Sequence, residues 1–217
     1  YSTEVQAGIM LAGNLWFPVM VGIGGVLFFV TPMVAQLYGA RNLKEIGPLA
    51  RQAIWLSLPI VLFGMFILSE AATILTIAKV DPSIIIYSEE YLSYFIFALP
   101  AILLSQPLRS LCEGVTRPLP ITLLNVLMLL IAIIGNYTFI YGNFGFPEMG
   151  ARGAGLSAVI GTWTTFILLI LYLKYKSAFG TELFSRFDMP NLKKLKEILV
   201  GGIPVGLGNF IELSMFS

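Results

Sequence analysis

Histidine is absent from the 217 residues, and cysteine occurs only once, at Cys112. The lack of histidine excludes His-based acid–base catalysis, and with a single cysteine the chain can form neither the usual zinc sites nor an internal disulfide. Charged residues make up only 12% of the chain, and no basic cluster interleaved with aromatic residues indicates nucleic-acid binding. We therefore expect no enzymatic activity, no cofactor and no nucleic-acid partner.

Long apolar stretches dominate what is present. Hydrophobic residues make up 57% of the chain, above the roughly half that is typical of soluble domains. A helix needs about 20 apolar residues to cross a hydrocarbon core of roughly 30 Å. Five uncharged intervals are long enough: residues 5–40, 52–69, 91–108, 118–147 and 153–173. A sixth interval begins at Ile198. The sequence predicts an all-α, polytopic membrane helical bundle, with kinks at Pro18 and Pro32 in the first interval.

Basic residues gather in every second joint between these intervals, and only Lys79 and Arg152 lie elsewhere. The three basic joints contain Arg41, Lys44 and Arg51, then Arg109 and Arg117, then Lys174, Lys176, Arg186, Lys193, Lys194 and Lys196. The positive-inside rule predicts a multi-pass protein of the cell inner (plasma) membrane, with these joints in the cytoplasm and Tyr1 outside. Because the chain opens without Met and stops within an apolar stretch, we expect it to be part of a longer protein. An odd number of further spans, most simply one, would then precede Tyr1.

Glu212 is the sharpest candidate for chemistry. It lies about 25 Å beyond Leu195 along a helix and has no basic neighbour in sequence. A carboxylate at membrane depth costs on the order of 3 kcal/mol or more, so such residues usually face a cavity and bind a cation or a proton. Asn209, one turn earlier on the same face, could orient the carboxylate. The alternative is that Glu212 has reached the outer interface and extends towards water.

Several uncharged polar side chains interrupt the other apolar intervals. Asn136 is the amide of the fourth interval that lies deepest, although an intramembrane Asn can instead hydrogen-bond a neighbouring helix. The further candidates for support or substrate contact are Asn14, Gln36, Gln106 and Tyr141. Polar groups in membrane helices thus leave both a binding and a packing interpretation open.

Small residues mark two places where helices can approach closely. Gly153, Ser157 and Gly161 recur at four-residue spacing and predict tight packing of the fifth interval. The glycines around Pro204 permit either tight packing or a helix that bends during a functional cycle; they are Gly201, Gly202, Gly206 and Gly208.

Four stretches together resemble the MATE (multidrug and toxic compound extrusion) family, in particular its NorM-like branch. They are VAQLYGARN at 34–42, PLRSLCEGVTRP at 107–118, NYTFIYGNFGFPEMGARGAG at 136–155 and GIPVGLGNFIE at 202–212. The resemblance implies helices 2 to 6 and the start of helix 7 of a twelve-helix, two-lobe transporter. Residues 1–176 would form the amino-terminal lobe without its first helix, residues 177–191 the cytoplasmic inter-lobe linker, and residues 192–217 the start of the carboxy-terminal lobe.

The resemblance also implies a function. Members of the family are secondary active transporters that export amphipathic or cationic organic compounds in exchange for Na⁺ or H⁺. This chain would then act in membrane lipid, as a monomer when full length, with no metal site beyond one for Na⁺. Glu212 matches an acidic residue of helix 7 that serves in cation or proton coupling, and Asn136 matches a position of the amino-lobe ion site. Ala132 and Ala158 stand where the family usually has Asn and Thr, so two oxygen ligands are missing.

Two other functions stay open at this point. A flippase for lipid-linked oligosaccharides would share the architecture, and it would be favoured by Arg and Lys at mid-membrane, which the apolar intervals lack. A non-transporting membrane scaffold or fragment would be consistent with the incomplete ends and the missing oxygen ligands.

Overall fold

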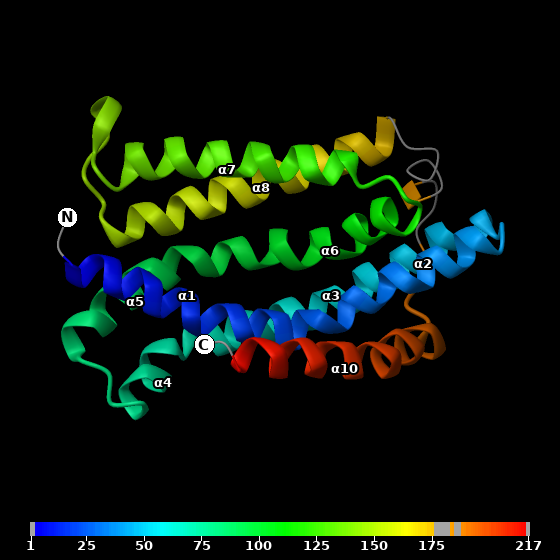
Figure 1. Cartoon of the computed structure of the whole chain (residues 1–217), viewed down its shortest axis with the longest axis horizontal. Helices are drawn as coiled ribbons and strands as arrows, with labels where there is room; N and C mark the ends of the chain where they lie inside the picture. The colour runs from blue at the N-terminus through cyan, green and yellow to red at the C-terminus, as the bar shows by residue number, and fades with distance from the viewer. Residues whose placement is uncertain (1–2, 176–182, 185–187, 216–217) are drawn as a thin grey trace.

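A computed structural model describes residues 3–175, 183–184 and 188–215 of the chain. Throughout these ranges the regular structure is helical, without a strand. The long helices lie side by side along one axis (Figure 1). The α-helices are α1 (Thr3–Gly24), α2 (Val30–Gly39), α3 (Ile46–Ser69), α4 (Ala71–Ile77), α5 (Pro82–Phe95), α6 (Leu99–Gly114), α7 (Leu119–Phe139), α8 (Ala151–Tyr175) and α10 (Leu192–Ser214). The 3₁₀ segments are η1 (Gly25–Phe29), η2 (Leu43–Glu45), η3 (Ile96–Ala98) and η4 (Asn143–Gly145).

Five helical segments are long and apolar enough to cross a membrane, as the sequence predicts. They are Val5–Gly39, Leu43–Ser69, Pro82–Gly114, Leu119–Phe139 and Ala151–Tyr175. The sixth apolar stretch forms α10. The predicted fold class, an all-α helical membrane bundle, is therefore confirmed.

Four of the predicted span boundaries were wrong. Helix α6 continues to Gly114, beyond the interval 91–108, and α7 ends at Phe139, within the interval 118–147. Helix α3 begins at Ile46 and α5 at Pro82, well before the uncharged intervals 52–69 and 91–108. Arg51 and Glu90 consequently lie inside helices, where counting uncharged residues placed joints. Both are neutralised by ion pairs, Arg51 with Asp188 at 2.6 Å and Glu90 with Arg152 at 2.9 Å. Because a paired charge near the end of a span is tolerated, a charged residue does not mark the end of a helix.

Short 3₁₀ segments interrupt two of the spans just before a proline. A proline cannot donate to the carbonyl four residues earlier, and its ring crowds that carbonyl. For Pro32 this carbonyl belongs to Phe28 in η1, and for Pro100 it belongs to Ile96 in η3. Helix α1, in contrast, runs through Pro18 without a break. The first span therefore changes from α-helical to 3₁₀ geometry at η1, the segment on which α10 packs.

The helices pack in a fixed order across the bundle. Helix α7 packs on α8, α8 on α5 and α6, and α6 on α2 and α3. Gly135 of α7 faces Ser157 of α8 so closely that an added Cβ would overlap the Ser157 hydroxyl, which confirms the predicted tight packing of the fifth span. In Figure 1, α7 and α8 lie at one edge of the bundle and α10 at the opposite edge, with α6 and α1 between them.

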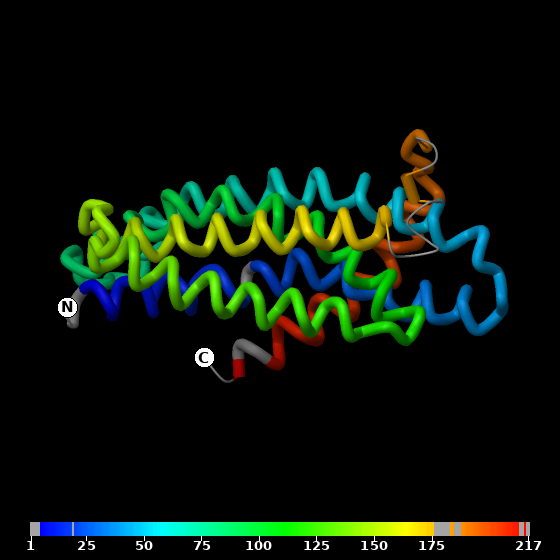
Figure 2. The backbone as a smooth tube through the Cα atoms, turned by 90° about the horizontal axis from the view of Figure 1, so that it is seen from above, coloured from blue at the N-terminus to red at the C-terminus, as the bar shows by residue number. Residues whose placement is uncertain are grey.

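The basic joints gather at one end of the bundle. The joints that follow α2 and α6, the end of α8 and the start of α10 lie towards the same end in Figures 1 and 2, whereas η4 and the joint between α4 and α5 lie towards the other. We call the first end the basic end; it carries Arg41, Lys44, Arg117 and Lys193. Its location in the cytoplasm stays a prediction.

Candidate functional site

Helix α10 lies so close to α1 and η1 that their backbones meet at glycines. A Cβ on Gly25 would lie 2.6 Å from the Cα of Gly206, and a Cβ on Gly206 would lie 2.8 Å from the carbonyl oxygen of Gly22. A Cβ on Gly202 would overlap the carbonyl oxygen of Val26. Of the two interpretations of this glycine cluster, the structure therefore shows tight packing. It also fixes the rotation of α10, and so decides which of its side chains face the rest of the bundle.

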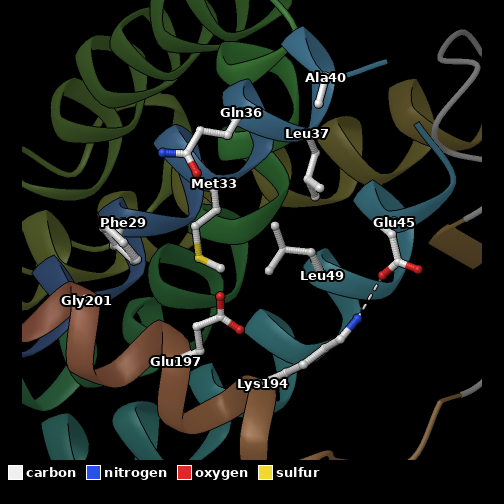
Figure 3. Close-up of a pocket in the computed structure, with 10 residues that line it drawn as sticks. All are labelled: Phe29, Met33, Gln36, Leu37, Ala40, Glu45, Leu49, Lys194, Glu197 and Gly201. Carbon is white, nitrogen blue, oxygen red and sulfur yellow. Dashed lines mark hydrogen bonds and ion pairs between the residues drawn. The ribbon is translucent and has the colours of Figure 1, made fainter. Parts of the chain in front are cut away.

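A cavity of about 570 Å³ lies next to this crossing, towards the basic end. Its walls come from the η1–α2 region, the start of α3 and the first turns of α10 (Figure 3). Most of the lining is apolar, with Phe29, Met33 and Leu49 prominent. We call this space the α2–α10 cavity.

Three charged side chains line the α2–α10 cavity. The ammonium group of Lys194 donates a hydrogen bond to Glu45 Oε2 at 2.9 Å, so these two charges balance each other. The carboxylate of Glu197 points into the cavity, and within the described part of the chain it makes no ion pair or hydrogen bond (Figure 3). Gln36 lines the same cavity from α2. Among the described residues that line the cavity, there is thus one carboxylate in excess.

Glu212 and Asn209, the predicted coupling residue and its support, lie on the last turns of α10. Glu212 is exposed and Asn209 half-buried in the structure. Glu212 lies fifteen residues after Glu197, which corresponds to about 22 Å along the helix. The coupling role of Glu212 stays a prediction.

Asn136, the second predicted coupling residue, is half-buried on α7. Helices α7 and α10 lie at opposite edges of the bundle, so the structure does not bring Asn136 and Glu212 together (Figure 1). The side chain of Asn136 has no hydrogen bond to any residue in the described ranges. Asn125, on the same helix, accepts a hydrogen bond from Arg109 Nη2 at 3.1 Å and so links α7 to α6. Asn136 has no such link among the described residues, and its role as an ion ligand stays a prediction.

The remaining predicted residues are spread over the bundle. Gln106 is half-buried on α6 and Asn14 is exposed on α1. Tyr141 is exposed after the end of α7, with its ring 6.3 Å from that of Tyr137. Of the predicted site residues, Gln36 lines the α2–α10 cavity and these three do not.

Sequence reasoning missed a set of polar contacts that fixes the segment before α10 to α3. Arg51 is buried and contacts Asp188 Oδ2 from both Nε and Nη2, at 2.7 and 2.6 Å. Trp55 Nε1 donates to the carbonyl of Asp188 at 2.9 Å, and the amide N–H of Asn191 donates to Gln52 Oε1 at 2.7 Å. We call Arg51, Gln52 and Trp55 the linker clamp. Residues 183–184 and 188–191 of the predicted inter-lobe linker are described, and the rest of it lies outside the described residues.

Glu197 was missed as well. Lys194, Glu197 and Gly201 recur at spacings of three and four, which places them on one face of a helix. That spacing was readable from the sequence, but the neighbours of this face depend on the glycine contacts of α10. The linker clamp carried no comparable signal, because Arg51 and Asp188 are 137 residues apart in sequence.

Comparison with known proteins identifies the family. The family model described as MatE matches residues 1–138. The chain belongs to the MatE family. Similar relatives of this MatE chain are the probable multidrug resistance proteins NorM of Shewanella oneidensis and Acinetobacter baylyi, each 32% identical, over 98% and 100% of the chain respectively. The chain covers 46% and 48% of these proteins and thus spans about half their length.

A solved structure shows the same fold. It is described as the outward-facing conformation of a multidrug resistance MATE family transporter of the MOP superfamily. It superposes with a TM-score of 0.85 at 20% identity, over 99% of this MatE chain and 47% of the solved one. The match to the MatE family model confirms the predicted family resemblance, and the chain spans about half the length of this solved structure.

The arrangement provides single carboxylates rather than a cluster of metal-binding side chains in the described part of this MatE chain. The described residues contain no group of three or more Asp, Glu, Cys or His side chains that could hold a metal ion. They do place two carboxylates on α10, Glu197 at the cavity and Glu212 towards the other end of the helix. Single carboxylates in apolar surroundings attract monovalent cations, protons or organic cations.

Proposed function

We propose that the full-length protein is a secondary antiporter that exports amphipathic, often cationic, organic compounds in exchange for Na⁺ or H⁺. In this proposal the α1–α8 bundle is the first of two helical lobes, residues 177–191 are the linker, and α10 is the first helix of the second lobe. The observation that carries it is the position of Glu212. This carboxylate is on α10, the helix through which the second lobe would pack against the first, so an ion bound there can influence how the lobes pack.

Glu212 binds the coupling ion in one arrangement of the lobes and releases it in the other. Asn136 is a subsidiary ligand in the first lobe, where Ala132 and Ala158 provide no side-chain oxygen. Because these two oxygens are missing, coupling depends mainly on Glu212. The protein needs no cofactor, works as a monomer in the inner membrane, and has its basic end in the cytoplasm.

The flippase alternative fits the α2–α10 cavity less well. A lipid-linked oligosaccharide carries phosphate groups, which require unpaired Lys or Arg side chains. Lys194, the basic residue that lines the cavity, is paired with Glu45, and Glu197 gives the cavity an excess of negative charge. The non-transporting alternative predicts no gradient-driven movement of any compound.

The test uses the full-length protein in liposomes loaded with a cationic dye. We expect dye export to start when either a Na⁺ gradient or a pH gradient is imposed, and a protonophore to abolish only the pH-driven export. Lipid-linked oligosaccharide transfer is measured on the same preparation. Transfer of this lipid without dye export, or no movement of either compound, would overturn the proposal.

A further inference from the structure

We propose that the α2–α10 cavity is a binding site for lipophilic organic cations, in which Glu197 neutralises the positive charge of the ligand. The proposal rests on the proposed function, because it assigns one binding site for the exported compound to the basic end of the protein. The site is separate from the coupling residue Glu212, which lies about 22 Å further along α10.

The charge of the cavity selects the sign of the ligand. Glu45 and Lys194 neutralise each other through a 2.9 Å ion pair, whereas Glu197 has no basic partner among the residues that the structure describes. A cation that enters therefore gains one attractive partner and breaks no existing pair. An anion would be repelled by Glu197, or would have to displace Glu45 from Lys194.

The apolar walls select a ligand with a lipophilic body. Met33 and Leu49 line the cavity, and a thioether adapts to ligands of different shape. Phe29 adds an aromatic ring, whose face attracts cations. This ring packs directly on Gly201, where an added Cβ would overlap it, so α10 fixes its position. A volume of about 570 Å³ is within the range of pockets that hold drug-sized molecules.

Gln36 supplies an uncharged polar group to the cavity. Its side chain makes no hydrogen bond to residues in the described ranges, and it lies on α2, across the cavity from α10 (Figure 3). A cationic ligand can therefore place its charge at Glu197 and a hydrogen-bonding group at Gln36. A small inorganic cation would use only the carboxylate and leave the apolar walls unoccupied.

The first experiment measures binding of tetraphenylphosphonium to the purified full-length protein by equilibrium dialysis. Glu197→Gln removes the charge but keeps the shape, and we expect it to raise the Kd about tenfold, which corresponds to 1.4 kcal/mol. Glu113→Gln is the matched control: Glu113 is exposed at the end of α6 and does not line the cavity, so its Kd should not change. Triphenylphosphine oxide, a neutral compound of similar shape, should bind equally well to the original protein and to Glu197→Gln.

The second experiment tests whether the ligand binds within the α2–α10 cavity. In a Cys112→Ser background, Met33→Cys introduces a thiol into the cavity wall, and tetraphenylphosphonium should slow its reaction with a maleimide. Undiminished labelling, or an unchanged Kd in Glu197→Gln, would overturn the binding site. If dye export is ion-driven and the Kd does not change, the site fails while the proposed function stands. If the Kd rises but no gradient drives export, the function fails and the site stands.

Discussion

Arg51 and Arg152 each form an ion pair with one carboxylate, but their surroundings differ. The side chain of Arg51 is 9% exposed and that of Arg152 is 55% exposed. An exposed pair contributes about 0–1 kcal/mol, whereas loss of a buried arginine that binds a carboxylate and a carbonyl costs about 3 kcal/mol. We therefore expect Arg51→Gln to lower the free energy of unfolding of the full-length protein by about 3 kcal/mol, and Arg152→Gln by less than about 1 kcal/mol.

Unfolding in detergent with increasing denaturant measures both variants. Equal decreases in the free energy of unfolding of Arg51→Gln and Arg152→Gln would show that the linker clamp contributes no more to stability than a surface ion pair. The physical reason for a difference is that Arg51 also donates to the carbonyl of Leu183, at 3.2 Å, so its removal breaks buried hydrogen bonds to two acceptors.

Asp81 gives a pH-dependent prediction outside the membrane spans. It caps the start of α5, and hydrogen bonds from the backbone N–H and the hydroxyl of Ser83 lower the pKa of its carboxyl below 3.8. A lowered pKa in the folded state means that the ionised group stabilises the fold above about pH 4, and that this stabilisation is lost as the pH falls through the folded-state pKa. Asp81→Ala should therefore lower the melting temperature at pH 7, and by less at pH 2.5.

Asp81→Asn serves as the control for this prediction, because asparagine caps helices about as well as aspartate and does not titrate. Its melting temperature should stay close to that of the original protein at pH 7. If the difference between Asp81→Ala and the original protein were the same at both pH values, the carboxylate would not be the stabilising form.

At the scale of single elements, the contact of α10 with η1 predicts opposite effects for two glycines of one helix. A Cβ on Gly202 would overlap the carbonyl of Val26, whereas nothing lies within 4 Å of a Cβ on Gly208. Overpacking a close contact costs about 1–3 kcal/mol, and replacing a helical glycine by alanine otherwise gains about 1 kcal/mol. We expect Gly202→Ala to destabilise the full-length protein and Gly208→Ala to leave it unchanged or stabilise it.

Unfolding in detergent with increasing denaturant measures both variants. Equal free energies of unfolding in Gly202→Ala and Gly208→Ala would contradict the backbone contact between α10 and η1.

The elements themselves were largely predictable, because lipid requires long apolar helices and water at the joints tolerates charge. The break at η1 was also predictable, since Pro32 removes a backbone donor. The starts of α3 and α5 were not, because the charges of Arg51 and Glu90 are neutralised by residues distant in sequence. The residues that line the α2–α10 cavity also depend on contacts between residues distant in sequence, so they could not be predicted. Glu197 faces the cavity because glycine contacts fix the rotation of α10.

At the scale of the whole molecule, the gathering of the basic joints at one end predicts the orientation. Thr116 lies in the joint after α6, and Glu148 lies between η4 and α8 at the other end; both are exposed. In a Cys112→Ser background, Glu148→Cys should react with an impermeant maleimide added to intact cells. Thr116→Cys should react only after the cells are made permeable. The reverse pattern would place the basic end outside and contradict the positive-inside assignment.

We propose that ion binding at Glu212 on α10 drives export by the full-length protein. The most direct test is ion-driven dye export by the full-length Glu212→Gln variant in liposomes, measured together with its dye binding. We predict that export under a Na⁺ or pH gradient falls to the level of empty liposomes, while the Kd for the dye stays within about twofold, less than 0.5 kcal/mol. Normal gradient-driven export by Glu212→Gln would contradict the account.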